Sequence, residues 1–458
     1  MGTRTTSVAT MLLVAGLGGV RAHAQGLTVQ QPVISRFGLG TTVSAPGFGG
    51  VAIDASGVVS SPKAVRVNAK LERARLRSSA ESNLPPDMFR SSKLRKVSLV
   101  QLEAELRKLA ESRQPIPADV FHLAGLTQIE YIFADRQSND IILAGPAEGF
   151  AATKAGAVIG VESGRPTLVL DDLLVMLRLP TLHQTLGVSF DPEKSRLAKA
   201  QTWFQSSPDA STVGQAKKQF RRMADLLGNW NVKLFGLPPS SHVTMRMVDA
   251  DFQMKRVNLG LRRTGIRGFK SQLEMMKPED NSMRRYWFAP RYNQIERSAN
   301  ADVFRISGPR LQLLSQEELA DAQGNRSAAA FTEVSTEAYT RQFNKHIDEL
   351  CQRIPAFAAL QNVFDMAIVA ALIRKHDLFR QVGWKPAILT DDKVLLTAVC
   401  PVPKEVPSQL NLRVENKTAV MFQIGGGVTL VPTAVIEKTS RLSKRVDLSP
   451  PADAWWWD

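Results

Sequence analysis

The segment that most constrains the fold runs from Asn229 to Leu261, where an apolar run, a Pro-Pro turn and a long amphipathic run follow one another. Its first part alternates with a period close to two, which predicts a strand ended by the two prolines. Ser240 or Ser241 is placed to cap a following helix. That helix is predicted by apolar residues recurring every three or four positions, namely Val243, Met247, Ala250, Met254 and Val257. No group in the segment requires a particular chemistry.

Two clusters of strand-like segments lie on either side of it. The first contains Ile129 to Phe133, DIILAGP, AVIGV and PTLVL, and the second contains RYWFAP, YNQIERS, DVFRIS and PRLQLLS. Brief polar turns join the first set, so its strands must run antiparallel, because a parallel crossover needs about a dozen residues. Helical patterns follow each cluster. The order predicts an α+β fold with two antiparallel β clusters, each followed by helices, and a small C-terminal β region.

Capping residues and prolines mark the expected helix boundaries. Ser98 and Gln101 have the spacing of a capping box before an apolar helical stripe. Asp171 or Asp172 is placed to cap the helix DLLVMLRL, with its carboxylate at the positive end of the helix. Near the second cluster, a helical stripe is expected to break at Pro355, which can occupy the first turn of the next helix.

The chain of 458 residues is long enough for two or three structural units, and its hydrophobic content of 44% is ordinary for a globular protein. Composition and pattern divide it into six segments. These are a signal peptide over 1–24, a loosely ordered Gly/Ser/Arg-rich segment over 25–95, a first α+β unit over 96–270, a second β meander with a helical pair over 271–380, a C-terminal β region over 381–449, and a flexible Trp-rich tail over 450–458.

The N-terminus has the pattern of a secretory signal peptide. Arg4 precedes an uncharged apolar run from Val8 to Val20, and Ala22-His23-Ala24 follows as a cleavage site. The pattern predicts export to the periplasm or the extracellular space after cleavage following Ala24. We expect no transmembrane segment, because this run and the later stretch Asn362–Arg374 are both shorter than the roughly 20 residues that cross a bilayer.

Cysteine usage leaves two alternatives open. The chain contains only two cysteines, Cys351 and Cys400. In an oxidising compartment they can form one disulfide, whereas free cysteines are also commonly buried as separate thiols. Their spacing in the sequence does not decide between the two.

The formal net charge of +15 favours contact with polyanions, although a well-solvated basic surface is the simpler interpretation. Export argues against nucleic acid as the partner and favours an acidic envelope polymer or a protein. Basic clusters beside aromatic residues are candidates for a binding groove, and the terminal tryptophans are candidates for interface anchors. The candidate binding residues are Lys217, Lys218, Arg221, Arg222, Arg284, Arg285, Trp287, Trp455, Trp456 and Trp457.

Catalytic and cofactor motifs are not found. The chain has no phosphate-binding loop, no H-E-x-x-H, no G-x-S-x-G and no paired C-x-x-C. We therefore expect no cofactor and no metal site, and no catalytic residue is assigned. Asp251 and Lys255 lie four residues apart and are expected to pair on their helix. A catalytic alternative would assemble a site from scattered groups such as Asp171, Asp172 and His183.

Several ordered segments resemble an uncharacterised family of exported planctomycete proteins, domain-of-unknown-function family 1598. The resemblance rests on GGVAIDASGVV, GLTQIEYIFADRQSNDIILAGPAEGF, GRPTLVLDDLLVMLR, VDADFQMKRVNLGL, RRYWFAPRY and IPAFAALQNVFDMAIVAALI, and it covers most of the mature chain. It brings no activity, catalytic residue or cofactor with it. The polar positions within these motifs are Asp171, Asp172, Asp249, Asp251 and Lys255.

Three hypotheses of function follow. The first is an exported, non-catalytic binding or assembly protein of the cell envelope. The second is an envelope hydrolase whose site is assembled from scattered Asp and His residues. The third is a nucleic-acid binder, which export disfavours and which predicts a steep loss of affinity with salt. The oligomeric state is left open.

Overall fold

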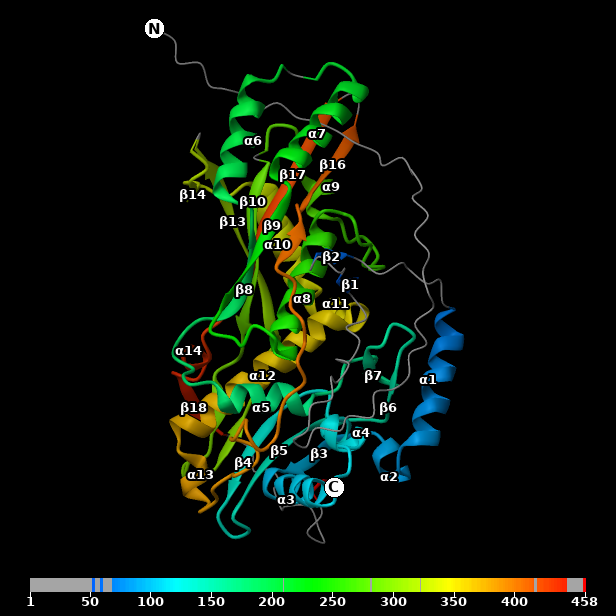
Figure 1. Ribbon diagram of the computed structural model, residues 1–458, viewed down its shortest axis with the longest axis vertical. Coiled ribbons are helices and arrows are strands. Elements are labelled where there is room, and N and C mark those ends of the chain that lie inside the picture. Colours follow the sequence, from blue (N-terminus) through cyan, green and yellow to red (C-terminus); the bar gives the residue numbers. More distant parts are fainter. Residues whose placement is uncertain are drawn as a thin grey trace.

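A computed structural model describes residues 52–53, 58–60, 68–208, 210–280, 282–321, 323–415, 418–442 and 456–458. The expected signal peptide, much of the segment 25–95, and Trp455 lie outside the described residues. The described chain mixes helices and strands in irregular order (Figure 1), so the predicted α+β class is confirmed.

The larger of the two main sheets has eight strands. They are β8 (Leu186–Asp191), β9 (Asn229–Phe235), β10 (Met283–Arg291), β13 (Arg310–Ala320), β14 (Arg326–Ala328), β15 (Glu405–Pro407), β16 (Leu410–Glu415) and β17 (Thr418–Leu430). Their order is β14-β13-β10-β17-β8-β9-β15, and β16 pairs with the first part of β17. All neighbours are antiparallel except β10 and β17, which are parallel. The segments 96–270, 271–380 and 381–449 thus interleave in one sheet instead of forming separate sheets.

The second main sheet has six strands in the order β18-β11-β12-β4-β5-β3. Their bounds are β3 (Ser92–Ser98), β4 (Tyr131–Asp135), β5 (Asp140–Ala147), β11 (Ile295–Arg297), β12 (Val303–Arg305) and β18 (Thr439–Arg441). Two short hairpins stand apart, β1 (Ala52–Ile53) with β2 (Val59–Ser60) and β6 (Phe150–Ala152) with β7 (Val158–Gly160). The strand predicted at PTLVL is wrong, because only Pro166 makes a bridge there and Leu170 already begins a helix.

Fourteen α-helices are described. They are α1 (Ala69–Asn83), α2 (Pro86–Phe89), α3 (Leu99–Glu111), α4 (Ala118–Phe121), α5 (Leu170–Arg178), α6 (Lys194–Ser206), α7 (Val213–Leu227), α8 (His242–Asn258), α9 (Gln272–Met275), α10 (Val334–Lys345), α11 (Ile347–Arg353), α12 (Pro355–Lys375), α13 (Leu378–Gln381) and α14 (Pro432–Val435). A 3₁₀ turn spans Leu123–Gly125. Ser98 caps α3, and Pro355 occupies the first turn of α12, as predicted.

Helices α8, α12 and α5 form the centre of the molecule (Figure 1). Ser241 caps α8 by accepting a hydrogen bond from the Thr244 amide at 3.2 Å, which confirms the predicted helix start. Helix α12 is long and apolar enough to cross a membrane, but its whole apolar stretch is buried against other parts of the protein. Cys351 and Cys400 are both buried free thiols, which decides between the two alternatives.

The two faces of the larger sheet differ in their cover. Helices α8, α10 and α12 pack on one face. On the other face, the α6–α7 pair covers only one end (Figure 1), where Leu197 and Met223 pack with Met283, Leu412 and Met421. Beyond this pair, the second face carries partly exposed polar and aromatic side chains. This uncovered part is where a ligand can reach the sheet.

Strand β17 fits between β8 and β10 only because its centre is Gly425-Gly426-Gly427. Gly426 has a φ of +107°, and a Cβ added there would lie 1.9 Å from the Tyr286 carbonyl oxygen. A Cβ at Gly427 would lie 1.8 Å from the Val188 carbonyl oxygen. Backbone atoms cannot yield as a side-chain end can, so close strand pairing requires glycine at both positions.

We predict that Gly426→Ala lowers the free energy of unfolding by about 3 kcal/mol or more, through overpacking and strain at positive φ. Gly383→Ala is the matched control. Gly383 also has a positive φ, +66°, but no atom lies within 4 Å of an added Cβ, so about 1 kcal/mol of strain is expected. Urea denaturation of both variants measures the difference. Equal losses would show that the approach of the strands at Gly426 is not the constraint.

Candidate functional site

A hollow of about 370 Å³ lies on the uncovered face of the larger sheet, and we call it the open-face groove. Polar and aromatic side chains from five adjacent strands and the loop before β8 line it. They include Thr185, Ser189, Phe235, Arg285, Trp287, Gln316 and Thr429. Phe235 is 44% exposed, which is unusual for a large aromatic side chain and leaves its ring accessible to a ligand.

Strand register gives the groove a low centre and two walls. Trp287 on β10 is paired with Gly427, Gly427 with Ser189, and Ser189 with Lys233 on β9. Small residues therefore occupy the two middle strands. Because side chains two residues apart share a face, Arg285 stands beside Trp287 and Phe235 beside Lys233. Arg285 and Trp287 thus lie about 14 Å from Lys233 and Phe235, across three strand spacings. Lys233 is exposed on the same face but does not itself line the hollow.

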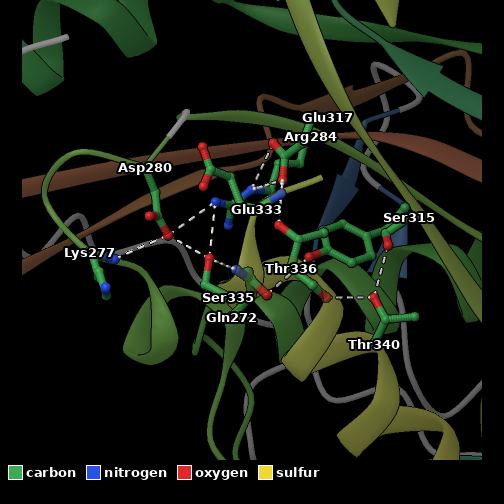
Figure 2. A network of polar contacts seen from close by, with 11 residues as sticks. Gln272, Lys277, Asp280, Arg284, Ser315, Glu317, Glu333, Ser335, Thr336 and Thr340 are labelled. Carbon is green, nitrogen blue, oxygen red and sulfur yellow. Dashed lines mark hydrogen bonds and ion pairs between the residues drawn. The ribbon is translucent and has the colours of Figure 1, made fainter. Parts of the chain in front are cut away.

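Arg284 lies on the opposite face of the same strand from Arg285. It is fully buried and forms ion pairs with Glu317, at 3.0 Å, and with Asp280, at 3.3 Å. Figure 2 shows this network, in which Ser335 and Thr336 at the start of α10 also bind the two carboxylates. The structure therefore separates Arg284 from the groove and places it in the contact between α10 and the sheet.

A buried charge network lies behind the floor of the groove. Lys255 on α8 is fully buried, pairs with Asp251 at 2.6 Å and donates to the Gly426 carbonyl oxygen at 3.0 Å. The pairing of Asp251 and Lys255 is thus confirmed. Burial raises the pKa of Asp251 to about 7 against the attraction of Lys255. Asp191 on β8 lies on the groove face, two residues from Ser189. Burial would raise the pKa of Asp191, but Arg326 and Ser189 lower it to about 2.

The predicted basic cluster on α7 forms a separate surface. Lys218, Arg221 and Arg222 are exposed and Lys217 is partly exposed, while the buried side of α7 contacts β16 and β17. The structure thus keeps these four residues together, but on the outer side of the helix that covers one end of the face. They do not line the open-face groove.

The end of the chain is packed, whereas the sequence suggested a flexible tail. Trp456 is only 2% exposed, and Trp457 bridges to Val97 on β3. Trp455 lies outside the described residues. The difference arises because β3 is an edge strand with unpaired backbone groups, and a short segment can satisfy them.

A second cluster of functional groups surrounds a small cavity of about 30 Å³, which we call the histidine cavity. His242 at the start of α8 contacts Asp172 through Nδ1 at 2.5 Å, and Asp172 also lies 3.7 Å from Nε of Arg246. His122 contacts the Thr167 hydroxyl through Nδ1 at 2.8 Å. His122, His242, Arg246 and Asp249 all line the cavity, together with the first turn of α12.

The residues proposed for a catalytic alternative do not come together. Asp171 accepts a hydrogen bond from the Ala398 amide at 3.0 Å, whereas Asp172 binds His242. Neither caps α5, whose N-cap is Val169 with no side-chain hydrogen bond, so the predicted cap is wrong; both residues do lie in the first turn of the helix, at its positive end, as predicted. His183 is exposed in a separate hollow of about 780 Å³. Only Asp172 joins the histidine cavity.

Burial sets the protonation of two of the groups that line this cavity. It lowers the pKa of His122 to about 3, with Arg246 and His242 acting in the same direction, so the imidazole is neutral. It raises the pKa of Asp249 to about 6, against its hydrogen bond from Gln253 and the attraction of Arg262 and Arg246. Within the described ranges, no group of three or more His, Cys, Asp or Glu side chains is placed to hold a metal ion.

Sequence reasoning missed several residues of both sites. Lys233 and Phe235 could have been found, because in NWNVKLF they alternate with the more buried Trp230, Val232 and Leu234. Ser189 follows the same alternation only once the pairing of β8 is known. His122 and His242 carry no local signal, because their partners are 45 and 70 residues away in the chain.

Comparison with known proteins identifies one family. Residues 188–271 match the profile of a family described as "Protein of unknown function (DUF1598)". The match confirms the resemblance to family 1598 over these residues. They include most of β8 and all of β9, which line one side of the open-face groove, and α8, which carries His242 and Arg246 of the second cavity. No curated protein and no solved structure matches the chain.

The cavity predicts opposite pH dependences for two variants. The raised pKa of Asp249 means that its contribution to stability is present at low pH and is lost as the pH rises from about 4 to 6, by about 3 kcal/mol. The lowered pKa of His122 has the opposite sign, because the unfolded chain binds a proton below about 6.5 while the folded chain does not.

Between pH 4 and 6, Asp249→Asn should therefore make the slope of the free energy of unfolding against pH more positive than in the wild type. His122→Gln should make the same slope less positive. Urea denaturation at several pH values measures both slopes. Unchanged slopes would contradict the assigned protonation states.

Proposed function

We propose that this chain, which carries a domain of the DUF1598 family over residues 188–271, is an exported, non-catalytic binding protein that holds an acidic polysaccharide of the cell envelope in the open-face groove. The observation that carries the proposal is the pairing of Trp287, Gly427, Ser189 and Lys233 across four strands. It creates a trough with a cation and an aromatic ring on each side.

The chemistry of the two walls favours a sugar acid. Aromatic rings supply rigid apolar area on which the C–H face of a sugar can lie. A guanidinium such as that of Arg285 binds a carboxylate in a bidentate manner, and Lys233 adds a point charge on the opposite wall. Gln316 and Thr429 supply amide and hydroxyl groups for sugar hydroxyls. An open trough suits a polymer better than an enclosed pocket does.

Two properties of the chain support an envelope location. The first residues have the pattern of a cleavable export signal, and the net charge of +15 favours anionic partners. Helix α12, Pro355–Lys375, is apolar enough to cross a membrane but is buried inside the protein, so it does not bear on this location.

The test uses the chain beginning at Gln25 and polygalacturonate as the acidic polymer, with a neutral glucan for comparison. We expect polygalacturonate to bind and the neutral glucan to bind at least tenfold more weakly. Trp287→Ala and Arg285→Ala should each weaken binding by roughly tenfold or more, as for residues at the centre of an interface. Isothermal titration calorimetry at low salt measures the affinities.

The matched control is Arg221→Ala, which removes an exposed cation outside the groove. It should change the affinity by less than about twofold if the groove is the site, because surface charges act weakly at a distance in salt. Equal losses for Arg221→Ala and Arg285→Ala would replace the groove with a diffuse basic surface. Tighter binding of single-stranded DNA than of polygalacturonate would contradict the polysaccharide assignment.

A second candidate function is hydrolysis at the histidine cavity. Asp172 holds Nδ1 of His242 and Thr167 holds Nδ1 of His122, so both rings are oriented. Asp249 also lines the cavity, and its pKa of about 6 is close enough to neutral pH for the carboxyl group to take part in proton transfer. The cavity of about 30 Å³ is large enough for one water molecule.

The two candidates are separated by a pair of variants. If the cavity is catalytic, His242→Asn abolishes release of reducing ends from envelope polysaccharide and Arg285→Ala weakens binding only. If the chain only binds, neither the wild type nor the variants release product. Product release that survives His242→Asn would exclude this cavity as the catalytic site.

A further inference from the structure

The last three residues of the chain add a short strand to the edge of β3. The Ser98 amide donates to the Trp456 carbonyl oxygen at 2.9 Å, and the Asp458 amide donates to the Lys96 carbonyl oxygen at 3.2 Å. Between them, Trp457 and Val97 form an antiparallel bridge. The tail is therefore held first by its main chain, in the manner of a peptide added to an exposed sheet edge.

Side chains make this edge selective for the sequence of this segment. Trp456 is buried, and the Trp457 ring lies 5.1 Å from the Arg95 guanidinium carbon. The Asp458 side chain accepts from the Lys96 amide at 2.6 Å and pairs with the Lys96 ammonium at 3.2 Å. Nε of Arg95 donates to the Asp458 main-chain oxygen at 3.1 Å. Two rings, one side-chain carboxylate and one main-chain oxygen are thus recognised together.

The body of the protein builds this site independently of the tail. Arg95 is 2% exposed and its other nitrogens donate to carbonyl oxygens of Asp87, Met88, Arg90 and Ala124. Burial lowers the pKa of Arg95, and Asp458 and Asp87 oppose that effect. The guanidinium is therefore held in place whether or not a tail is bound.

The connection between the tail and the body is longer than the path it must cover. Strand β18 ends at Arg441, on the opposite edge of the six-stranded sheet from β3. Five strand spacings separate the two edges, roughly 24 Å. Residues 442–455 can extend to about 45 Å. The surplus is enough for the tail to reach a neighbouring molecule.

We propose that the edge of β3 is a docking site for the C-terminal Trp456-Trp457-Asp458 segment of a second copy of this chain, so that copies are linked by exchange of their tails. Every contact of the tail is with residues that an identical copy also presents, so exchange preserves all of them. Its own tail competes at an effective concentration of order mM, and linkage therefore grows where copies are crowded.

The first experiment uses the double variant Trp456→Ala, Trp457→Ala in the chain beginning at Gln25, which leaves the β3 edge unoccupied by aromatic side chains. A fluorescent synthetic peptide ending in Trp-Trp-Asp should bind this variant, and should bind the wild type at least tenfold more weakly, because the wild-type tail competes. Fluorescence polarisation measures both. Failure of the peptide to bind a variant with native-like circular dichroism overturns the proposal.

The Asp458 side-chain carboxylate is tested from the ligand side, because Lys96 also belongs to β3. A peptide ending in Trp-Trp-Asn should bind roughly tenfold more weakly than one ending in Trp-Trp-Asp, since it loses the charge-assisted contacts with Lys96. A peptide with the same residues in scrambled order is the control. Equal binding of all three peptides would mean that the site recognises no particular sequence.

Exchange between copies is tested by sedimentation velocity over a range of concentrations up to about 1 mM. The wild type should self-associate as its concentration rises, and the double variant should remain monomeric. Asp458→Asn, which changes only one partly exposed carboxylate, gives a second and milder variant with intermediate association. Self-association that is identical in the three proteins, or absent from the wild type, contradicts tail exchange.

Discussion

The ammonium group of Lys255 is the contact on which the middle of the structure depends. It is fully buried where α8 crosses the larger sheet, and it joins Asp251 of its own helix to the Gly426 carbonyl of β17. The Phe190 ring lies 4.3 Å from it on β8. A buried charge is tolerated only when partners surround it. The contacts of Lys255 therefore fix the positions of α8, β17 and β8 relative to one another. The floor of the open-face groove is the outer side of that arrangement.

Local patterns in the sequence predict a helix or strand well where the residues that begin and end it lie within or next to it. The strand and helix of Asn229–Leu261 are recognisable because alternation, prolines and a serine cap act within a few residues. Pairing between distant strands leaves no such trace. Nothing near Thr418 indicates that β17 lies beside β10 in parallel, and nothing near His242 indicates Asp172 as its partner. The sites are therefore less predictable than the elements that carry them.

The net charge of the sequence does not show which arginines lie on the surface and which are bound inside the protein. The chain looks uniformly basic, but several of its arginines bind backbone carbonyl groups inside the protein. Arg178 donates to three carbonyls between Ile388 and Leu395, and Arg310 binds Asp365 and the carbonyls of Ile129 and Ile306. Guanidinium groups suit this task because five donors lie in one plane. Adjacent arginines can accordingly have different roles: Arg284 forms buried ion pairs in the core, and Arg285 lines the open-face groove.

The position of β17 also determines when the protein can complete its fold. Residues 418–430 lie between strands that the chain supplies more than a hundred residues earlier, so the larger sheet has a gap until nearly the whole sequence has been synthesised. Sheets closed by such distant pairings form slowly, and folding by successive domains is not open to them. In a nascent chain, the two parts of the larger sheet therefore cannot be joined until residue 430 has been synthesised.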